Sequence, residues 1–194
     1  MLRLYSKSDS KEFLKQGYEM KPNLVKLGRE LKENRIVLMI VEPEDFYRKV
    51  LDTAVVLSHN FNKICYITIT RPYELLKDVL IKKDVDTKKF FFIDFVTERA
   101  SKYGEDVEFV SPNNLTDFGI AFSKAIEEIH VDSSIFDNVS PLLVYNSEND
   151  VLKFLISMIG RARDNKILLV LILLKTEREV NFAKELFIFV DKVL

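Results

Sequence analysis

Short apolar runs alternate along the chain with segments of helical periodicity. Five of the runs are nearly continuous and rich in branched or aromatic residues: 36–41, 64–70, 90–93, 142–145 and 167–173. Strands buried on both faces of a parallel sheet have this composition, whereas half-exposed strands alternate apolar and polar positions. The runs therefore predict five buried, mostly parallel strands.

Between the runs, apolar residues recur with the 3.6-residue period of an amphipathic helix. Four such helices are predicted to begin after Pro43, at Pro72, after Asn114 and after Ser147. Proline is tolerated in a first turn, and Asn or Ser side chains accept hydrogen bonds from first-turn amides. Alternating strands and helices imply right-handed βαβ crossovers. We therefore expect an α/β fold of three layers, an open and mostly parallel sheet with helices on both faces.

The two ends of the chain depart from this alternation. Residues 1–33 have a broken helical pattern, and we interpret them as an appendage to a core formed by residues 35–194. The run 186–190 fits a sixth strand by its composition, but its apolar positions also fit one face of a helix. No linker separates these parts, so residues 1–194 are expected to form a single domain.

The net charge of the chain and the length of its apolar runs limit which partners and which cellular location we expect. The chain has 29 basic and 30 acidic residues, a net charge of −1, so it lacks the general attraction for phosphate backbones, and nucleic acid is not an expected partner. Its longest aliphatic run, 167–174, is far shorter than the ~20 residues of a membrane helix, and no signal peptide is evident. We expect a cytoplasmic protein with no membrane partner.

Familiar catalytic and cofactor motifs are missing. Only five glycines occur, and none matches G-x-G-x-x-G or G-x-x-x-x-G-K-S/T. The single cysteine, Cys65, lies in an apolar run and is expected to be buried, and His59 and His130 alone cannot complete a zinc site or suggest a hydrolase triad. We therefore predict no catalytic residue, no metal and no cofactor.

Polar residues follow most of the predicted strands, at the edge where open α/β sheets bind ligands. Three of them offer charge to a ligand: Arg71, Asp94 and Lys175. The alternative is that polar residues follow the strands because the chain turns there. Other carboxylate pairs are explained by solvation beside helix ends and loops: Glu127/Glu128 and Asp132/Asp137.

Residues 35–194 resemble the RecA superfamily of ATPases, especially its archaeal branch of KaiC-like proteins and RadA-like recombinase paralogues. In that family the first strand leads into the Walker A loop, a glycine-rich turn that ends in Gly-Lys-Ser/Thr. The corresponding residues, 40–49, read Ile-Val-Glu-Pro-Glu-Asp-Phe-Tyr-Arg-Lys and contain no glycine. The chain therefore resembles a degenerate member that lacks Walker A.

The resemblance also assigns expectations to later strands. After the second strand the family commonly has acidic residues, including the glutamate that activates water, whereas this chain has Thr70 and Arg71. The third run closes on Asp94, as a Walker B segment does, whose carboxylate holds Mg²⁺ through water. The family also suggests assembly into rings or filaments.

Three functional hypotheses follow. The first is a non-catalytic RecA/KaiC-like domain that acts as a regulatory or structural module and binds a protein partner or its own copies. The second is a small-molecule or nucleotide-sensing module that binds its ligand with Arg71, Asp94 and Lys175. The third is an enzyme of another class that binds a divalent metal through a cluster of acidic side chains: Glu42, Glu44, Asp45 and Asp94.

Overall fold

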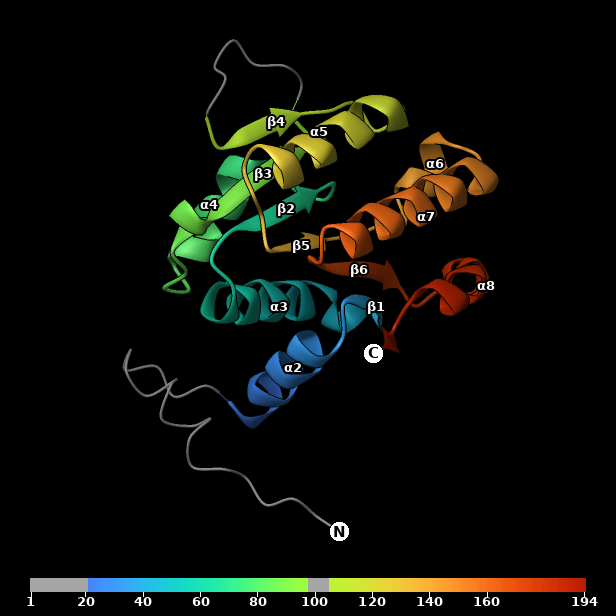
Figure 1. Ribbon diagram of the computed structural model, residues 1–194. Coiled ribbons are helices and arrows are strands. Elements are labelled where there is room, and N and C mark those ends of the chain that lie inside the picture. The colour runs from blue at the N-terminus through green and yellow to red at the C-terminus, as the bar shows by residue number, and fades with distance from the viewer. Residues whose placement is uncertain (1–20, 98–104) are drawn as a thin grey trace.

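A computed structural model of the protein describes residues 21–97 and 105–194. Its centre is a seven-stranded sheet of order β4-β3-β2-β5-β6-β1-β7, in which every neighbouring pair is parallel (Figure 1). The strands are β1 (Ile36–Val41), β2 (Ile64–Thr68), β3 (Phe90–Asp94), β4 (Val107–Phe109), β5 (Ser133–Phe136), β6 (Leu168–Leu174) and β7 (Lys192–Val193). The open parallel sheet expected from the sequence is confirmed.

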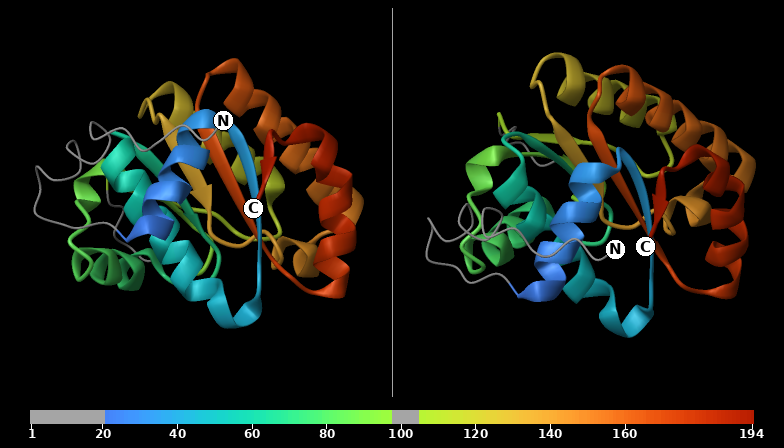
Figure 2. Two further views of the ribbon diagram at one scale, coloured as in Figure 1. Left: turned by 90° about the horizontal axis from the view of Figure 1, so that it is seen from below. Right: turned by 60° about the horizontal axis from the view of Figure 1, so that its bottom comes forward.

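Helices cover both faces of this sheet (Figures 1 and 2). One face carries α2 (Pro22–Glu33), α3 (Phe46–Asn60) and α4 (Tyr73–Ile81). The other carries α5 (Leu115–Glu127), α7 (Glu148–Asp164) and α8 (Glu177–Leu186). The connections β1–β2 and β2–β3 move across the sheet toward the β4 edge, whereas β4–β5 and β5–β6 move toward the β7 edge. Because each crossover is right-handed, these opposite directions place the connecting helices on opposite faces.

Alternate side chains of each strand enter one of two apolar cores. On β1, for example, Val37 and Met39 face α2 and α3, whereas Ile36 and Leu38 face the α5, α7 and α8 side. Cys65 is fully buried, as expected, and burial raises the pKa of its thiol well above the usual range. Burial on both sides explains why these strands have continuous apolar sequences.

The strand predicted at residues 142–145 is wrong, because this run forms the short helix α6 (Leu142–Tyr145). Leu142 and Leu143 are buried while Val144 and Tyr145 are exposed, so one turn of helix directs only half of the run into the core. The strand at this place in the sheet is β5, which lies earlier in the chain and begins with two buried serines. Those serines interrupt the apolar pattern that identified the other strands.

The structure decides between the two alternatives for residues 186–190. They form no strand, because α8 continues to Leu186 and a 3-10 turn, η4 (Phe187–Phe189), follows it, so the helical alternative is the closer one. The short edge strands β4 and β7 had no counterpart in the sequence pattern. The helical pattern before residue 34 is confirmed for α2, while its first 20 residues lie outside the described part. None of the helices in residues 21–97 and 105–194 is long and apolar enough to cross a membrane.

Candidate functional site at the carboxyl edge of the sheet

The carboxyl ends of β2 and β5 lie next to each other at a topological switch point. The chain leaves β2 toward α4 on one face of the sheet, and it leaves β5 toward α6 and α7 on the other. Open α/β proteins bind ligands in the crevice that such diverging connections form. The segments to consider first are therefore 69–72, after β2, and 137–141, after β5.

Asp137 connects these two segments. Its side chain is almost fully buried, with 1% of the residue exposed. Its Oδ1 accepts a hydrogen bond from the Ile69 amide at 3.1 Å, and its Oδ2 accepts from the hydroxyls of Thr68 at 3.0 Å and Thr70 at 2.7 Å. A single carboxyl group thus fixes the loop after β2 against the end of β5.

Burial raises the pKa of Asp137 from 3.8 to about 6, although hydrogen bonds from Thr70, Ile69 and Thr68 act in the opposite direction. The Thr68 hydroxyl has one hydrogen but lies near two acceptors, the Arg71 carbonyl oxygen at 2.8 Å and Asp137 Oδ2 at 3.0 Å. A protonated Asp137 can donate to this hydroxyl, which then donates to Arg71. The network therefore accommodates a neutral carboxyl group.

This geometry corrects the interpretation of Asp137 from the sequence. Solvation does not explain this side chain, because it is buried and bonded to a neighbouring loop. The segment Ser-Ser-Ile-Phe-Asp that ends at Asp137 closes a strand on an aspartate, as Phe-Phe-Phe-Ile-Asp does at Asp94. That signal would have identified Asp137 if residues 133–136 had been recognised as a strand. Asp132, which forms a carboxylate pair with Asp137 in the sequence, instead accepts hydrogen bonds from the amides of Asn62 and Lys63.

Asp94 lies in the same row of residues, opposite Thr68 in the register of β3 and β2. Its Oδ1 accepts from the amides of Val96 at 2.7 Å and Thr97 at 3.0 Å. Its Oδ2 accepts from the Tyr73 amide at 2.9 Å and from the Thr97 hydroxyl at 2.6 Å. The chain's own donors thus occupy both oxygens, and the carboxylate organises the turn after β3 and the start of α4.

Arg71 is held above the loop after β2 by an aromatic ring. Its Cζ lies 4.2 Å from the centroid of the Tyr47 ring, which belongs to the first turn of α3. Such stacking orients a guanidinium and leaves its N–H groups free to point elsewhere. No carboxylate forms a salt bridge with Arg71 within the part of the chain that the structure describes.

Lys175 lies at a different part of the edge. Its Nζ donates to Glu42 Oε1 at 2.5 Å, and this exposed ion pair joins the ends of β6 and β1. Three strand steps separate the end of β3, with Asp94, from the end of β6, which corresponds to about 14 Å. Asp94 and Lys175 are therefore not brought together, whereas Arg71 and Asp137 are linked through Thr68.

The connection from β1 to α3 is a tight turn. Residues Pro43–Asp45 form the 3-10 turn η2, in which the amides of Asp45 and Phe46 donate to the carbonyls of Glu42 and Pro43. The acidic side chains here do not gather with Asp94, which is four strands away. In the described ranges, no group of three or more His, Cys, Asp or Glu residues is arranged to hold a metal ion.

A family described as being of unknown function, DUF7504, matches residues 67–194, which is well over half of the chain. The chain belongs to the DUF7504 family. No curated protein matches this DUF7504 sequence.

Solved structures show what this DUF7504 chain resembles in fold. The KaiC-like protein PH0186 of the hyperthermophilic archaeon Pyrococcus horikoshii OT3 superposes with a TM-score of 0.61 at 12% identity, over 82% of this chain and 69% of that one. The DUF1998 helicase MrfA matches with a TM-score of 0.50 at 11% identity, over 100% of this chain and 33% of its own, so the chain spans a third of that helicase. The RecA/KaiC-like fold expected from the resemblance is thus confirmed.

Proposed function

We propose that this DUF7504 chain is a non-catalytic domain with a RecA/KaiC-like fold that acts as a regulatory or structural interaction module. The observation that carries the proposal is the turn between β1 and α3. Phosphate loops bind nucleotides with free backbone N–H groups, but here two amides already donate within the turn and Pro43 has none. Glu42 and Asp45 are paired with Lys175 and Arg48, but the carboxylate of Glu44 forms no salt bridge among the described residues and would also repel a triphosphate.

The carboxylates at the ends of β3 and β5 support the same proposal. A magnesium site or a general base needs a carboxylate with oxygens free for water or substrate. Asp94 accepts four hydrogen bonds from the chain, and Asp137 accepts three. Both groups therefore have a structural use in holding loops that surround the edge of the sheet.

We expect no ATP turnover and no heat of binding when the protein is titrated with Mg·ATP to about 1 mM, a concentration that would detect binding stronger than about −4 kcal/mol. Phosphate release and calorimetry are the measurements. Should heat be seen, Lys49→Ala, on the first helix after the turn, is compared with Lys82→Ala, directly after the end of α4. Micromolar binding that is accompanied by turnover would contradict a non-catalytic domain.

The free guanidinium of Arg71 favours a second candidate, an anion-sensing site at the switch point. An arginine that is oriented by an aromatic ring and has no carboxylate partner is suited to bind phosphate or carboxylate groups. Such a site would use Arg71 without Asp94 or Lys175, because both of those side chains have partners within the chain.

For this candidate we expect inorganic phosphate or AMP to raise the melting temperature, because a ligand that binds only the folded state stabilises it. Arg71→Ala should abolish the shift. Tyr47→Leu should weaken it, whereas Tyr47→Phe keeps the ring and should retain it. Arg48→Ala, which removes a nearby arginine already paired with Asp45, is the matched control. An absence of any shift for the wild-type protein would reject the anion site.

A further inference from the structure

The hydroxyl group of Thr68 is the contact between the buried Asp137 and the loop that carries Arg71. Thr68 is the last residue of β2, and it lies where β2 and β5 end next to each other (Figure 1). Its Oγ lies 3.0 Å from Asp137 Oδ2, 2.8 Å from the Arg71 carbonyl oxygen and 3.4 Å from the Arg71 amide nitrogen. No salt bridge joins Asp137 to Arg71 in the described ranges. Thr68 is therefore the hydrogen-bonded link between them.

The ionisation state of Asp137 decides how this link is made, because a hydroxyl group donates one hydrogen bond and accepts two. An ionised Asp137 can only accept, so it competes with the Arg71 carbonyl for the single hydrogen of Thr68. A protonated Asp137 can donate to Thr68 Oγ, which also accepts from the Arg71 amide and donates to the Arg71 carbonyl. Among the described residues no backbone amide outside the helices and strands donates to that carbonyl. Protonation thus secures the Arg71 backbone through both of its polar groups.

We propose that anion binding at Arg71 is coupled to proton uptake by Asp137, so that the switch point forms a proton-linked site for oxyanions. The inference rests on the second candidate function and adds the regulation of that same site. The carbonyl contact fixes the backbone from which the Arg71 side chain reaches the Tyr47 ring, so the proton helps to orient the guanidinium. A guanidinium that is already oriented loses less conformational entropy when it binds. Its forked N–H groups suit a sulfate or phosphate group.

Asp137 is the group at this edge that titrates between neutral and mildly acidic pH. Burial raises its pKa to about 6, and the other groups that act on it are hydrogen bonds from residues 68–70. On β2, burial and the charge of Asp137 raise the pKa of Tyr66 well above its usual range, and Arg71 stays charged. On β3, Asp94 is bonded to its own turn. Both histidines of the chain precede a strand and therefore lie at the opposite, amino edge of the sheet: His59 before β2 and His130 before β5.

Inorganic sulfate is the probe for this coupling, because a phosphate group itself titrates near pH 6, at about the same pH as Asp137. The full chain is titrated with sulfate at constant ionic strength, at about pH 5 and about pH 8, and the amide resonances of residues 69–71 report binding. We expect the dissociation constant to be about tenfold lower at the acidic pH. By reciprocity, saturating sulfate should move the midpoint of the Asp137 carboxyl titration upward by about one pH unit.

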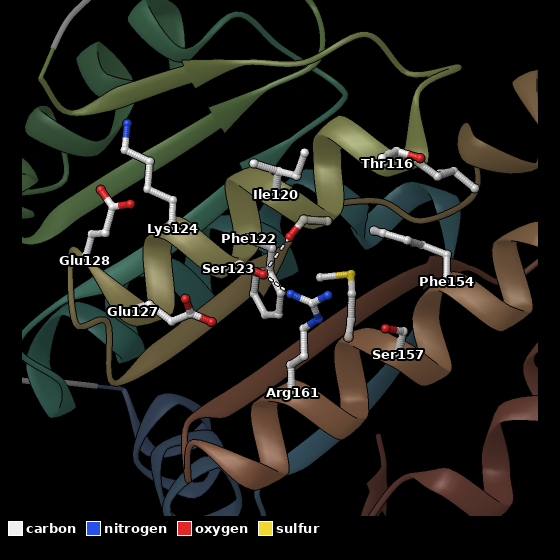
Figure 3. A pocket seen from close by; sticks show the side chains of 13 residues that line it. Thr116, Ile120, Phe122, Ser123, Lys124, Glu127, Glu128, Phe154, Ser157 and Arg161 are labelled. Atoms are coloured by element: carbon white, nitrogen blue, oxygen red, sulfur yellow. Dashed lines mark hydrogen bonds between the residues drawn. The ribbon is translucent and has the colours of Figure 1, made fainter.

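Four variants separate the parts of the link. Asp137→Asn mimics the protonated acid, because its amide can donate to Thr68, so it should bind sulfate at both pH values as tightly as the wild type at the acidic pH. Thr68→Val removes the hydroxyl and should bind with the weaker affinity at both. Arg71→Ala should abolish binding. Glu127→Gln is the matched control: it removes an exposed carboxylate at the end of α5, beside the groove with α7 (Figure 3), and should keep the pH dependence of the wild type.

Sulfate binding by the wild type with equal affinity at both pH values would overturn the coupling and leave the anion site standing. The coupling would equally fail if a folded Asp137→Asn variant bound as weakly at the acidic pH as the wild type does at the alkaline pH. A Glu127→Gln variant without pH dependence would assign the proton to another group. No sulfate binding at either pH would reject the second candidate function and this inference with it. The wild-type titration and Asp137→Asn give these results even if Thr68→Val does not fold.

Discussion

Replacing Phe118 with alanine is expected to lower the free energy of unfolding by about 3–5 kcal/mol. Phe118 is fully buried in α5, and its ring contacts three other rings with centroid distances of 4.6 Å to Phe95, 5.4 Å to Phe136 and 4.6 Å to Phe154. These rings belong to the turn after β3, to β5 and to α7. The substitution therefore leaves a cavity where four parts of the fold meet.

Denaturant unfolding of the wild-type and variant proteins measures this loss. Ile120→Ala is the matched control, because it truncates an exposed apolar residue of the same helix and should change stability by about 0.5 kcal/mol or less. A loss below about 1 kcal/mol for Phe118→Ala would show that this cluster is not packed as the structure has it.

The fold could be predicted wherever a strand was uninterrupted in the sequence. The runs that form β1, β2, β3 and β6 are apolar, except for Thr68 and Asp94 at the ends of β2 and β3, because both of their faces are buried. β5 is equally buried but contains Ser133 and Ser134, and the Ser134 hydroxyl lies 3.3 Å from the carbonyl oxygen of Leu168. This hydrogen bond makes the buried Ser134 acceptable, whereas the buried Ser133 hydroxyl has no hydrogen-bond partner among the described residues. Both serines remove the apolar signal of the strand.

The opposite error occurred at residues 142–145, where four apolar residues have the composition of a strand. Length decides between the alternatives only for longer runs, since a four-residue run fits either a strand or one helical turn. The structure buries Leu142 and Leu143 and exposes Val144 and Tyr145. Which of these four residues are buried follows from the position of the run directly after β5. The sequence pattern did not reveal β5.

The site was predictable as an edge of the sheet but not as a set of contacts. Arg71 and Asp94 do follow strands at the carboxyl edge, as the pattern indicated. Which of these residues meet depends on the order of the strands, and sequence periodicity does not determine that order. The stacking of Arg71 on Tyr47 and the link from Thr68 to Asp137 therefore came only from the structure.

Asp137→Asn is expected to become more stable relative to the wild type as the pH rises from about 4 to about 6, by at most about 3 kcal/mol. The pKa of Asp137 is raised in the folded protein from 3.8 to about 6. Between these values the folded protein retains a proton that the unfolded chain has released. Raising the pH across this window therefore favours unfolding of the wild type, and the penalty is constant above it.

The asparagine variant is a suitable mimic of the neutral acid. Its carboxamide oxygen can accept from the Ile69 amide, and its two N–H groups can donate to the hydroxyls of Thr68 and Thr70, where the wild-type carboxyl oxygens now lie. The loop after β2 is thus expected to keep its place. All other titrating groups are common to both proteins, so they cancel in the difference between the two stability profiles.

Denaturant unfolding at several pH values gives this difference, and the carbon chemical shift of the Asp137 carboxyl group gives the titration directly. Thr70→Val removes a hydrogen bond that lowers the pKa of Asp137, so this variant should move the midpoint to a higher pH. A difference profile that is flat from pH 4 to pH 7 would mean that Asp137 is ionised in the folded protein despite its burial. The loop that carries Arg71 would then be held by a buried, ionised Asp137 carboxylate. Protonation of Asp137 would not be coupled to the position of the candidate anion site.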